Sequence, residues 1–405
     1  MAEDFPDRED RAGMSKPPSI AVVGAGIGGL AVAALLKRAG YDVQVYEQAR
    51  RFERVGAGIQ MTPNAVKVLR RLGIEERLRQ VAFRSELRLS REWDSGEITS
   101  ELKLGEEVER KFGAPFLCLH RADLHAAIES TVPPDIVHFG MKLVDLDRNA
   151  HGVTLIFADG IRVRADAVIG ADGVHSVVRE TLFGPEKPRF TGRVAYRALF
   201  AAARRGDTRV APVQTKWWGP DRHVVIYYVT ATRDQIYFVT SVPEGTEWMT
   251  RESWSAKGDL DELRKAYSGF HAEVRAVLDA CPGVYKWALL ERDPLPRWSE
   301  GRVVLLGDAC HPMTPYMAQG AAAALEDAAV LARCLEQTGR DDLEQAFRLY
   351  EGTRKPRASA IQAKSSTNTW MRTDADPGWV YGYDAWSAPL GKPPAVPDVK
   401  ATEHG

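Results

Sequence analysis

The sequence is poor in cysteine: Cys118, Cys281, Cys310 and Cys334 are the four in 405 residues, and none stands in a CxxC or similar spacing. Thiols spaced in this way argue against a metal site, and they fit a reducing cytoplasm. No apolar run approaches the ~20 residues needed to cross a bilayer, so we expect no membrane association. The charged residues 1–16 have the pattern of neither a signal peptide nor a transit peptide, and we expect a disordered tail there.

The sequence also lacks an excess of charge of either sign. Its 54 basic and 55 acidic residues give a formal net charge of −1, which provides no general attraction for nucleic acid or an anionic membrane. A hydrophobic content of 44% and a charged content of 27% are ordinary for a globular enzyme. A chain of this length can form two lobes with substantial cores, and it leaves open whether the protein is a monomer or a homodimer.

What the sequence does contain is three motifs typical of dinucleotide binding. In the first, residues 19–29 (SIAVVGAGIGG) are predicted to form a buried strand, a glycine turn and the start of a helix. Glycines at GxGxxG spacing permit a tight turn, a close approach to a pyrophosphate and packing of the helix on the strand. The glycines of this turn are Gly24, Gly26, Gly28 and Gly29. Glu47 ends the next predicted strand, where it can accept hydrogen bonds from a ribose, and Gln48 beside it is a further candidate contact.

The second motif, residues 166–179 (DAVIGADGVHSVVR), places an Asp-Gly turn at the end of a predicted strand. We interpret Ser176 as the N-cap of the following helix. Asp172 is a candidate contact to the dinucleotide, although an Asp-Gly turn is also common in loops that bind nothing.

The third motif, residues 301–312 (GRVVLLGDACHP), ends a predicted buried strand at Asp308. Ligands of α/β sheets bind at the carboxyl ends of strands, where this carboxylate can accept hydrogen bonds from ribitol hydroxyls. Residues 315–321 are expected to open a helix whose free N–H groups, around Gly320 and Ala321, favour negative charge on a reduced isoalloxazine. Two dinucleotide motifs at opposite ends of the chain, with a third between them, predict FAD as the cofactor.

The order of predicted elements indicates an α/β fold. We expect a Rossmann-like FAD-binding domain, an inserted and mainly antiparallel β-sheet substrate domain, and C-terminal helices. Arg121 begins a predicted helix, and its guanidinium can fold onto the pyrophosphate or the ribitol. The predicted boundaries are 17–82, 106–184 and 286–340 for the FAD-binding domain, 83–105 and 185–285 for the substrate domain, and 341–405 for a C-terminal helix and aromatic tail.

Hydrophobic periodicity supplies more detailed expectations. Residues 85–104 alternate charged and apolar positions and are predicted to form exposed antiparallel strands. Residues 137–172 are predicted to form a strand meander, and residues 260–280 a single helix. Residues 64–80 are predicted to form a helix that is interrupted at Gly73.

Candidates for substrate binding come from the aromatic-rich substrate domain. Residues 223–230 are predicted to form a strand, on which His223 and Tyr227 share one face. That face would place an imidazole and a phenol side by side, where both can hydrogen-bond or deprotonate a phenolic substrate. Both side chains would equally fit an ordinary sheet core, and Trp217 and Trp218 are expected to be core residues.

Together the three motifs resemble the class A flavoprotein monooxygenases of the para-hydroxybenzoate hydroxylase fold, over residues 17–390. Residues 216–228 (KWWGPDRHVVIYY) and 368–384 (NTWMRTDADPGWVYGYD) resemble the branch of that family that hydroxylates 6-hydroxynicotinate. The second of these segments is the more specific link, because no general flavin function requires it.

The resemblance implies an FAD enzyme that uses NADH or NADPH and O2 to hydroxylate an aromatic carboxylic acid through a flavin C4a-hydroperoxide. With 6-hydroxynicotinate, the oxygen would enter at the carboxylate-bearing carbon, with release of CO2 and formation of 2,5-dihydroxypyridine. Tyr227, with His223 beside it, would be the base or the orienting group for the ring hydroxyl. Salicylate or a hydroxybenzoate is the alternative substrate, and a flavoprotein without hydroxylase activity is the alternative class.

Three pocket positions depart from the pattern of the nicotinate-hydroxylating branch. Gln60 and Tyr316 stand in place of histidines, and Gln214 stands in place of a cysteine. The resemblance implies that all three contact the substrate and that Gln60 also lies at the junction with the flavin. A glutamine still exchanges hydrogen bonds, but it supplies no titratable proton near neutral pH.

Overall fold

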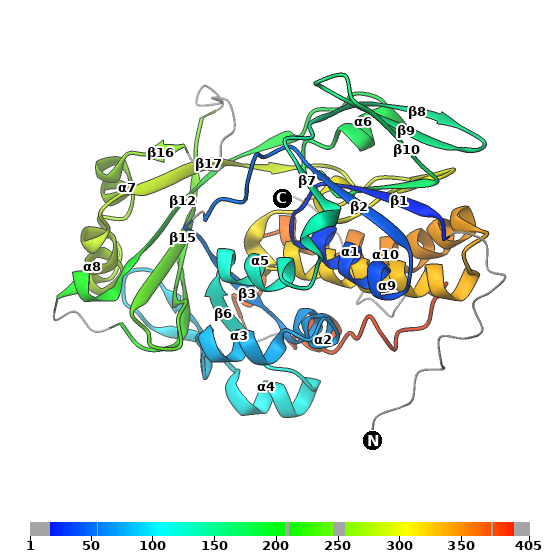
Figure 1. Ribbon diagram of the computed structural model, residues 1–405. Coiled ribbons are helices and arrows are strands. Elements are labelled where there is room, and N and C mark those ends of the chain that lie inside the picture. The colour runs from blue at the N-terminus through cyan, green and yellow to red at the C-terminus, as the bar shows by residue number, and fades with distance from the viewer. Residues whose placement is uncertain (1–16, 55, 207–209, 246–255, 374–375, 393–405) are drawn as a thin grey trace.

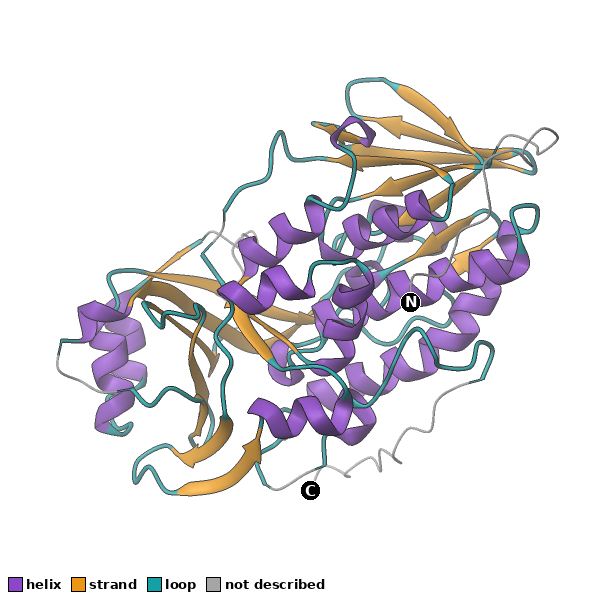
Figure 2. Ribbon diagram, turned by 60° about the horizontal axis from the view of Figure 1, so that its bottom comes forward, coloured by secondary structure: helices purple, strands orange, loops and turns teal. Residues whose placement is uncertain are grey.

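The computed structural model describes residues 17–54, 56–206, 210–245, 256–373 and 376–392; the tail predicted at 1–16 lies outside these ranges. Two large sheets dominate the described chain, one mainly parallel and one mainly antiparallel (Figure 1). Figure 2 shows helices gathered in the middle of the molecule, with strands on either side of them. This arrangement confirms the predicted α/β class with an antiparallel sheet and C-terminal helices.

A six-stranded sheet in the order β18-β19-β11-β1-β2-β7 carries the first and third motifs. Its neighbouring strands pair in parallel, except β18 with β19. The strands are β1 Ser19–Val23, β2 Asp42–Glu47, β7 Val137–Phe139, β11 Ala167–Gly170, β18 Ser299–Glu300 and β19 Val303–Leu305. Segments far apart in the sequence therefore meet in one sheet, as the paired motifs predicted.

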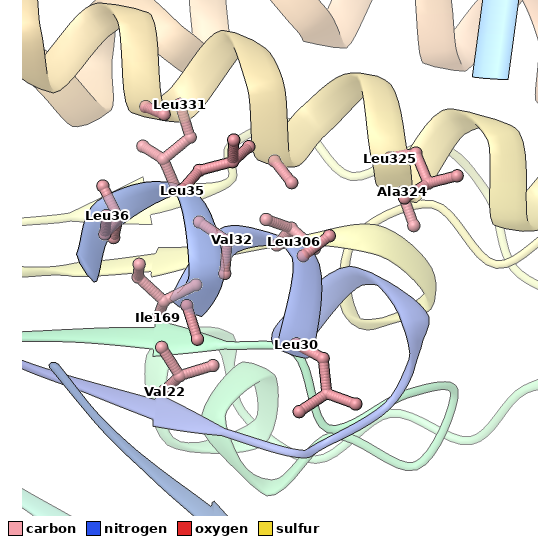
Figure 3. Packing of buried hydrophobic residues seen from close by; sticks show 14 of the residues in the cluster. Val22, Leu30, Val32, Leu35, Leu36, Ile169, Leu306, Ala324, Leu325 and Leu331 are labelled. Carbon is pink, nitrogen blue, oxygen red and sulfur yellow. The ribbon is translucent and has the colours of Figure 1, made fainter. Parts of the chain in front are cut away.

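Helices cover this sheet and also pack on one another, and both contacts bury apolar side chains. Helix α1 (Ile27–Arg38) lies between the strands and the long helix α9 (Gly320–Thr338), as Figure 3 shows. Helix α10 (Leu343–Ser366) packs on α9 in turn. Leu30 and Leu331 are fully buried in this layer. Burial of each such side chain contributes about 1.5–3 kcal/mol, so apolar area holds the layers together.

The meander predicted over residues 137–172 is only partly correct. Its central strands, β8 (Leu143–Asn149), β9 (Gly152–Phe157) and β10 (Arg162–Ala165), form an antiparallel sheet with a turn at Gly160. The outer segments, β7 and β11, join the parallel sheet instead. All four residues of β11 are buried, as expected for a strand covered on both faces, and local periodicity does not distinguish such a strand from its neighbours.

The second large sheet has eight strands in the order β16-β17-β12-β15-β14-β13-β4-β5. Neighbours pair antiparallel, except that β4 pairs in parallel with β13. The strands are β4 Leu87–Glu92, β5 Ile98–Lys103, β12 Arg189–Ala201, β13 Gln214–Trp218, β14 His223–Tyr228, β15 Gln235–Pro243, β16 Lys257–Gly258 and β17 Val284–Glu291. The predicted antiparallel character of this part of the chain is confirmed.

One expectation about this sheet needs correction. Strands β4 and β5 do pair antiparallel, but β4 is not an exposed strand, because its pairing with β13 buries Leu89 and Ser90. Strand β17 extends the sheet to Glu291. The division into domains stays a prediction, and sheet membership would move its boundary from residue 285 to a point after that strand.

The single helix predicted over residues 260–280 is in fact two helices, α7 (Leu260–Ala266) and α8 (Ala272–Ala280). The cause is the side chain of His271, which accepts a hydrogen bond from the Glu273 N–H and so begins a new helix. Both helices lie at the outer edge of the antiparallel sheet in Figure 1.

Shorter elements connect the two sheets. They are β3 Gly58–Met61, β6 Leu117–His120, α2 Pro63–Arg71, α3 Glu75–Val81, α4 Gly105–Phe112, α5 Arg121–Glu129, α6 Val177–Phe183 and α11 Gly378–Tyr381. The predicted interruption at Gly73 is confirmed, since its φ of +78° separates α2 from α3. None of the helices in the described ranges has the length and apolarity that a membrane-spanning segment requires.

Candidate functional site

The turn between β1 and α1 has a geometry that requires glycine. Gly24 has a φ of +100°, and a Cβ there would lie 2.4 Å from the carbonyl oxygen of Ala171. A Cβ on Gly29 would lie 2.0 Å from the carbonyl oxygen of Gly24, so this glycine lets the helix pack on the turn. Gly26 is different, because it is exposed and nothing lies within 4 Å of its Cβ position. That space adjoins the N-terminus of α1, where a pyrophosphate binds favourably.

Glu47 ends β2 beside this turn. Its two carboxylate oxygens accept hydrogen bonds from the N–H groups of Ala25, at 2.9 Å, and Ala49, at 2.8 Å. Each oxygen keeps a free lone pair, so the contact to a ribose stays a prediction, as does that of the exposed Gln48. Gly28 points into the core instead and has a packing role, since a Cβ there would lie 2.6 Å from Leu306 Cδ2.

Strands β3 and β6 bring Arg121 to the third motif. The N–H of Arg121 donates to the Ala57 carbonyl at 2.8 Å, and the guanidinium attracts the carboxylate of Asp308. Burial lowers the pKa of Arg121 and raises that of Asp308, and their mutual attraction opposes both shifts. Both side chains nevertheless keep exposed surface. They therefore line an opening within otherwise dense protein.

Helix α9 begins at the same place. The Cβ position of Gly320, its first residue, lies 3.8 Å from Asp308 Oδ1, and no side chain caps its first turn. Ala321 follows and is half-buried. The helix start predicted within residues 315–321 is correct only at its end, because a 3-10 turn comes first and Ala318, with a φ of +55°, separates it from α9.

Asp172 has a structural role in addition to its predicted one. Its carboxylate accepts from the Ser176 hydroxyl at 2.5 Å and from the Val178 N–H at 3.1 Å, and Ser176 in turn accepts from the Arg179 N–H. These bonds cap α6 and confirm the predicted N-cap. Contact of Asp172 with the cofactor stays a prediction.

His223 and Tyr227 share one buried face of β14, as predicted. In the ladder with β15, His223 lies opposite Ser241 and Tyr227 lies opposite Tyr237. They are four residues apart, a span of ~13 Å along the strand. They are therefore not side by side, and they suit opposite ends of a small ring.

Tyr227 lies close to β3. A Cβ on Gly58 would lie 2.9 Å from its hydroxyl, its ring meets that of Tyr237 edge-on at 5.2 Å, and Gln60 hydrogen-bonds to the hydroxyl. Burial raises the pKa of Tyr227 well above its ordinary value, Tyr237 and Cys118 add to the rise, and the bond from Gln60 opposes it. Tyr227 is therefore a neutral phenol at neutral pH, which favours an orienting role over that of a base.

His223 lies between two aromatic rings, with centroid distances of 5.5 Å to Trp218 and 5.4 Å to Tyr316. Tyr316 comes from the 3-10 turn η6 (Pro315–Met317) that precedes α9, so both large parts of the fold contribute to this site. Burial holds the pKa of His223 well below its ordinary value, and the charges of Lys216 and Arg193 act in the same direction. The imidazole is neutral.

Gln214 begins β13 and is buried. Its backbone N–H donates to the Ser85 hydroxyl at 2.9 Å, whereas its side-chain Oε1 has no hydrogen-bond partner among the described residues. An unpaired buried acceptor costs about 1–3 kcal/mol, so this oxygen marks a place for a donor on a ligand.

Sequence reasoning did not single out two basic residues of this sheet, Lys216 and Arg193, or Asn368 from the tail beside it. Lys216 of β13 is buried and donates to the Asn368 side-chain oxygen at 3.3 Å. Arg193 of β12 donates to Ser241 Oγ at 2.7 Å. The sequence did contain an indication of this site: Lys216 is two positions along a strand from Gln214, so both side chains lie on the same face of the sheet.

Comparisons with known proteins show the family of the chain. The FAD binding domain family matches residues 18–365. The 6-hydroxynicotinate 3-monooxygenases of Bordetella bronchiseptica and Pseudomonas fluorescens are 48% and 46% identical to the chain, over 93% and 94% of its length and 98% of theirs. The crystal structure of Klebsiella pneumoniae HpxO complexed with FAD and uric acid superposes with a TM-score of 0.77 at 28% identity, over 89% of this chain and 90% of that one.

The parallel sheet, the glycine turn and the opening lined by Arg121 and Asp308 are those of a dinucleotide-binding flavoprotein. We call the eight-stranded sheet, which carries the candidate substrate residues, the ligand-binding sheet. The chain belongs to the FAD binding domain family, and FAD is its cofactor. The resemblance drawn from the three motifs is thereby confirmed. The free space at Gly26 and the uncapped start of α9 fit the phosphates and the flavin of such a cofactor.

Proposed function

We propose that this protein is an FAD-dependent aromatic monooxygenase acting on 6-hydroxynicotinate, which it converts to 2,5-dihydroxypyridine with release of CO2. The observation that carries the proposal is the buried polar face of β14, which holds His223 and Tyr227. Tyr237 links that face to the cofactor opening, because it contacts the Tyr227 ring and interacts with the charge of Arg121. The match to two enzymes of that name over nearly their whole length supports the substrate.

When bound, FAD supplies the reduction of O2 and the transfer of one oxygen atom to the ring; the side chains orient the substrate. Tyr227 donates a hydrogen bond to the substrate, and the Gln60 amide, which donates to the Tyr227 hydroxyl, fixes the direction of that bond. Gln60 is the residue expected at the flavin junction, so the carbon that is hydroxylated lies at the Tyr227 end. His223 then lies at the far end of the ring, with the ring hydroxyl, so we reassign to His223 the contact with that hydroxyl that the resemblance gave to Tyr227.

The unpaired Oε1 of Gln214 favours a hydroxypyridine over a benzoate. In its pyridone form a 6-hydroxypyridine ring carries an N–H that can donate to this oxygen, whereas a benzoate ring carries none. Tyr316 closes the other side of the site, where its hydroxyl bonds to Ser241 Oγ at 2.9 Å. The replacements at positions 60, 214 and 316 thus keep hydrogen-bonding capacity while removing groups that titrate near neutral pH.

The remaining partners follow from the family that the motifs indicate. NADH or NADPH delivers the electrons and O2 the oxygen atom, and the enzyme works in the cytoplasm as a monomer or homodimer. The buried free thiols of all four cysteines support a reducing compartment.

A substrate panel tests the proposal. The purified holoenzyme is mixed with NADH or NADPH and with 6-hydroxynicotinate, nicotinate, salicylate or 4-hydroxybenzoate, while NAD(P)H oxidation, CO2 and product mass are followed. We expect 6-hydroxynicotinate to stimulate NAD(P)H oxidation most strongly, with one CO2 released per NAD(P)H consumed. Efficient hydroxylation of salicylate alone would reassign the substrate. NAD(P)H oxidation that no aromatic acid stimulates would exclude a hydroxylase.

A further inference from the structure

Three side chains from distant parts of the chain form a line of hydrogen bonds on the ligand-binding sheet. Lys216 Nζ on β13 donates to Asn368 Oδ1 at 3.3 Å, and Asn368 Nδ2 lies 3.3 Å from His223 Nδ1 on β14. Neither the glycine turn nor the flavin motifs require this line, and Asn368 belongs to the aromatic tail for which no general flavin function accounts.

Lys216 sets the direction of these bonds. Because Lys216 Nζ donates to the carboxamide oxygen of Asn368, the NH2 group of the same carboxamide faces the imidazole. Lys216 Nζ also lies 3.7 Å from the centre of the Trp218 ring, a position that favours its positive charge. The Nδ1 atom of His223 must then accept, which leaves the imidazole proton on Nε2.

The surroundings of His223 suit a neutral donor. Its Nε2 atom makes no hydrogen bond to any described residue, while its ring is held between Trp218 and Tyr316. The charged groups that act on it are Lys216 from β13 and Arg193 from β12, both of them basic. A basic environment disfavours a second proton on the imidazole and favours negative charge on whatever its N–H contacts.

The tail is built to hold Asn368 in this place. Asn368 has a φ of +49°, a left-handed conformation that asparagine adopts more readily than most residues. Three residues on, the Met371 carbonyl accepts from Ser90 Oγ at 2.5 Å, and Trp370 is buried in the same core. These contacts tie the segment to β4, next to the strand that carries Lys216.

We propose that Lys216 and Asn368 are positioning residues that hold His223 as an Nε2–H donor to the ring oxygen of the substrate. The identity of that oxygen depends on the proposed function. The protonation state of the imidazole does not, because it follows from the hydrogen bonds of His223 and Asn368. In 6-hydroxynicotinate the ring oxygen lies across the ring from the carboxylate-bearing carbon, as His223 lies at the end of the site away from Tyr227. A donor there stabilises the negative charge that the ring oxygen carries in the pyridone form, the form whose ring N–H can donate to Gln214 Oε1.

The state of the imidazole is tested without substrate. Two-dimensional 15N NMR of the holoenzyme labelled at histidine reports which ring nitrogen carries the proton, and the His223→Gln variant assigns the signal. We expect Nε2–H in the wild type. Asn368→Asp preserves the left-handed backbone but cannot donate to Nδ1, so a proton should appear on Nδ1. A wild-type His223 protonated at Nδ1, or a signal that Asn368→Asp leaves unchanged, would overturn the proposal.

Kinetics test the consequence. Asn368→Asp and Lys216→Met should lower kcat/KM for 6-hydroxynicotinate about tenfold or more without loss of FAD, and Lys216→Arg should recover part of it. Thr369→Ala, at an exposed neighbouring position, should match the wild type. Variants as active as the wild type would contradict the positioning role. If 6-hydroxynicotinate is instead inert with the wild type, the proposed function fails, while the NMR result still decides the state of the imidazole.

Discussion

Two groups of charged side chains in the described part of the chain differ in whether their charges are paired. Beneath the start of α9, two carboxylates are surrounded by three basic groups at distances between 2.5 and 2.9 Å. The carboxylates are those of Glu326 and Asp327, and the basic groups are those of Arg354, Arg357 and His311. All five side chains are buried, and each has a partner of opposite charge.

On the ligand-binding sheet the balance is different. Lys216 is buried as deeply, and it makes no ion pair with the described residues. Burial and nearby arginines hold its pKa well below its ordinary value, and an anion bound beside it would favour its protonated form. Arg193, which is half-buried nearby, donates to uncharged oxygens: the hydroxyl and carbonyl of Ser241 and the backbone carbonyl of Asp221. A buried charge without a partner is costly. The paired group therefore maintains the fold, whereas the unpaired basic group is suited to an anionic ligand.

The largest expected effect comes from breaking the paired group. Arg354→Met leaves Glu326 and Asp327 with too little positive charge and should lower the free energy of unfolding by about 3–5 kcal/mol. Lys216→Met removes an unpaired charge instead, and should leave stability unchanged or slightly higher. Urea unfolding of both holoenzymes measures the contrast. Equal destabilisation by the two substitutions would refute the distinction.

The glycine turn allows a similar contrast between packing and ligand binding. Gly29→Ala places a Cβ 2.0 Å from the Gly24 carbonyl oxygen. It should lower the free energy of unfolding by about 3 kcal/mol, and the variant should also lose FAD. Gly26→Ala has open space, so it should fold normally and bind FAD at least tenfold more weakly, because the added methyl group occupies the pyrophosphate space. Thermal unfolding and flavin fluorescence separate the two effects. Normal FAD affinity in Gly26→Ala would show that the phosphates bind elsewhere.

Removing one hydroxyl from the ligand-binding sheet should affect catalysis alone. Tyr227→Phe keeps the ring packed against Tyr237 but removes the bond to the substrate, and should lower kcat roughly 10- to 100-fold with FAD content unchanged. Steady-state kinetics and the flavin absorbance of the purified variant check both parts. A wild-type rate would mean that Tyr227 only packs.

The paired group should also give stability a defined pH dependence. Burial raises the pKa of both carboxyls, but nearby basic groups hold each pKa below its ordinary value. For Glu326 these groups are Arg357 and Arg354, and for Asp327 they are His311 and Arg354. Their contribution is therefore present above pH ~4 and is lost as pH falls through the lowered values.

The pKa of His311 is raised by Asp327 against the effect of burial, so its contribution is complete below pH ~6.5 and is lost as pH rises through the raised value. Urea unfolding should show a stability maximum between these limits, with a change of about 1–2 kcal/mol on either side. A flat profile from pH 6 to 9 would show that His311 does not titrate there.

The same comparison explains how much was predictable from sequence. The cofactor side is encoded by local patterns, so the glycine turn, Asp308 and Ser176 could each be read within a dozen residues of sequence. The ligand-binding sheet depends on long-range pairing. The Lys216 to Asn368 bond joins residues 152 positions apart, and the parallel pairing of β4 with β13 leaves no local trace. His271 could not be read as a helix start, because its side chain replaces a more usual cap.

The central claim is that the unpaired basic group on this sheet binds an aromatic acid anion beside FAD. Titration of 6-hydroxynicotinate into the holoenzyme, followed by the flavin absorbance shift, tests it in the wild type and in Lys216→Met. The account predicts saturable binding to the wild type and at least tenfold weaker binding to a variant of undiminished stability. Equal affinity in the two proteins would contradict it.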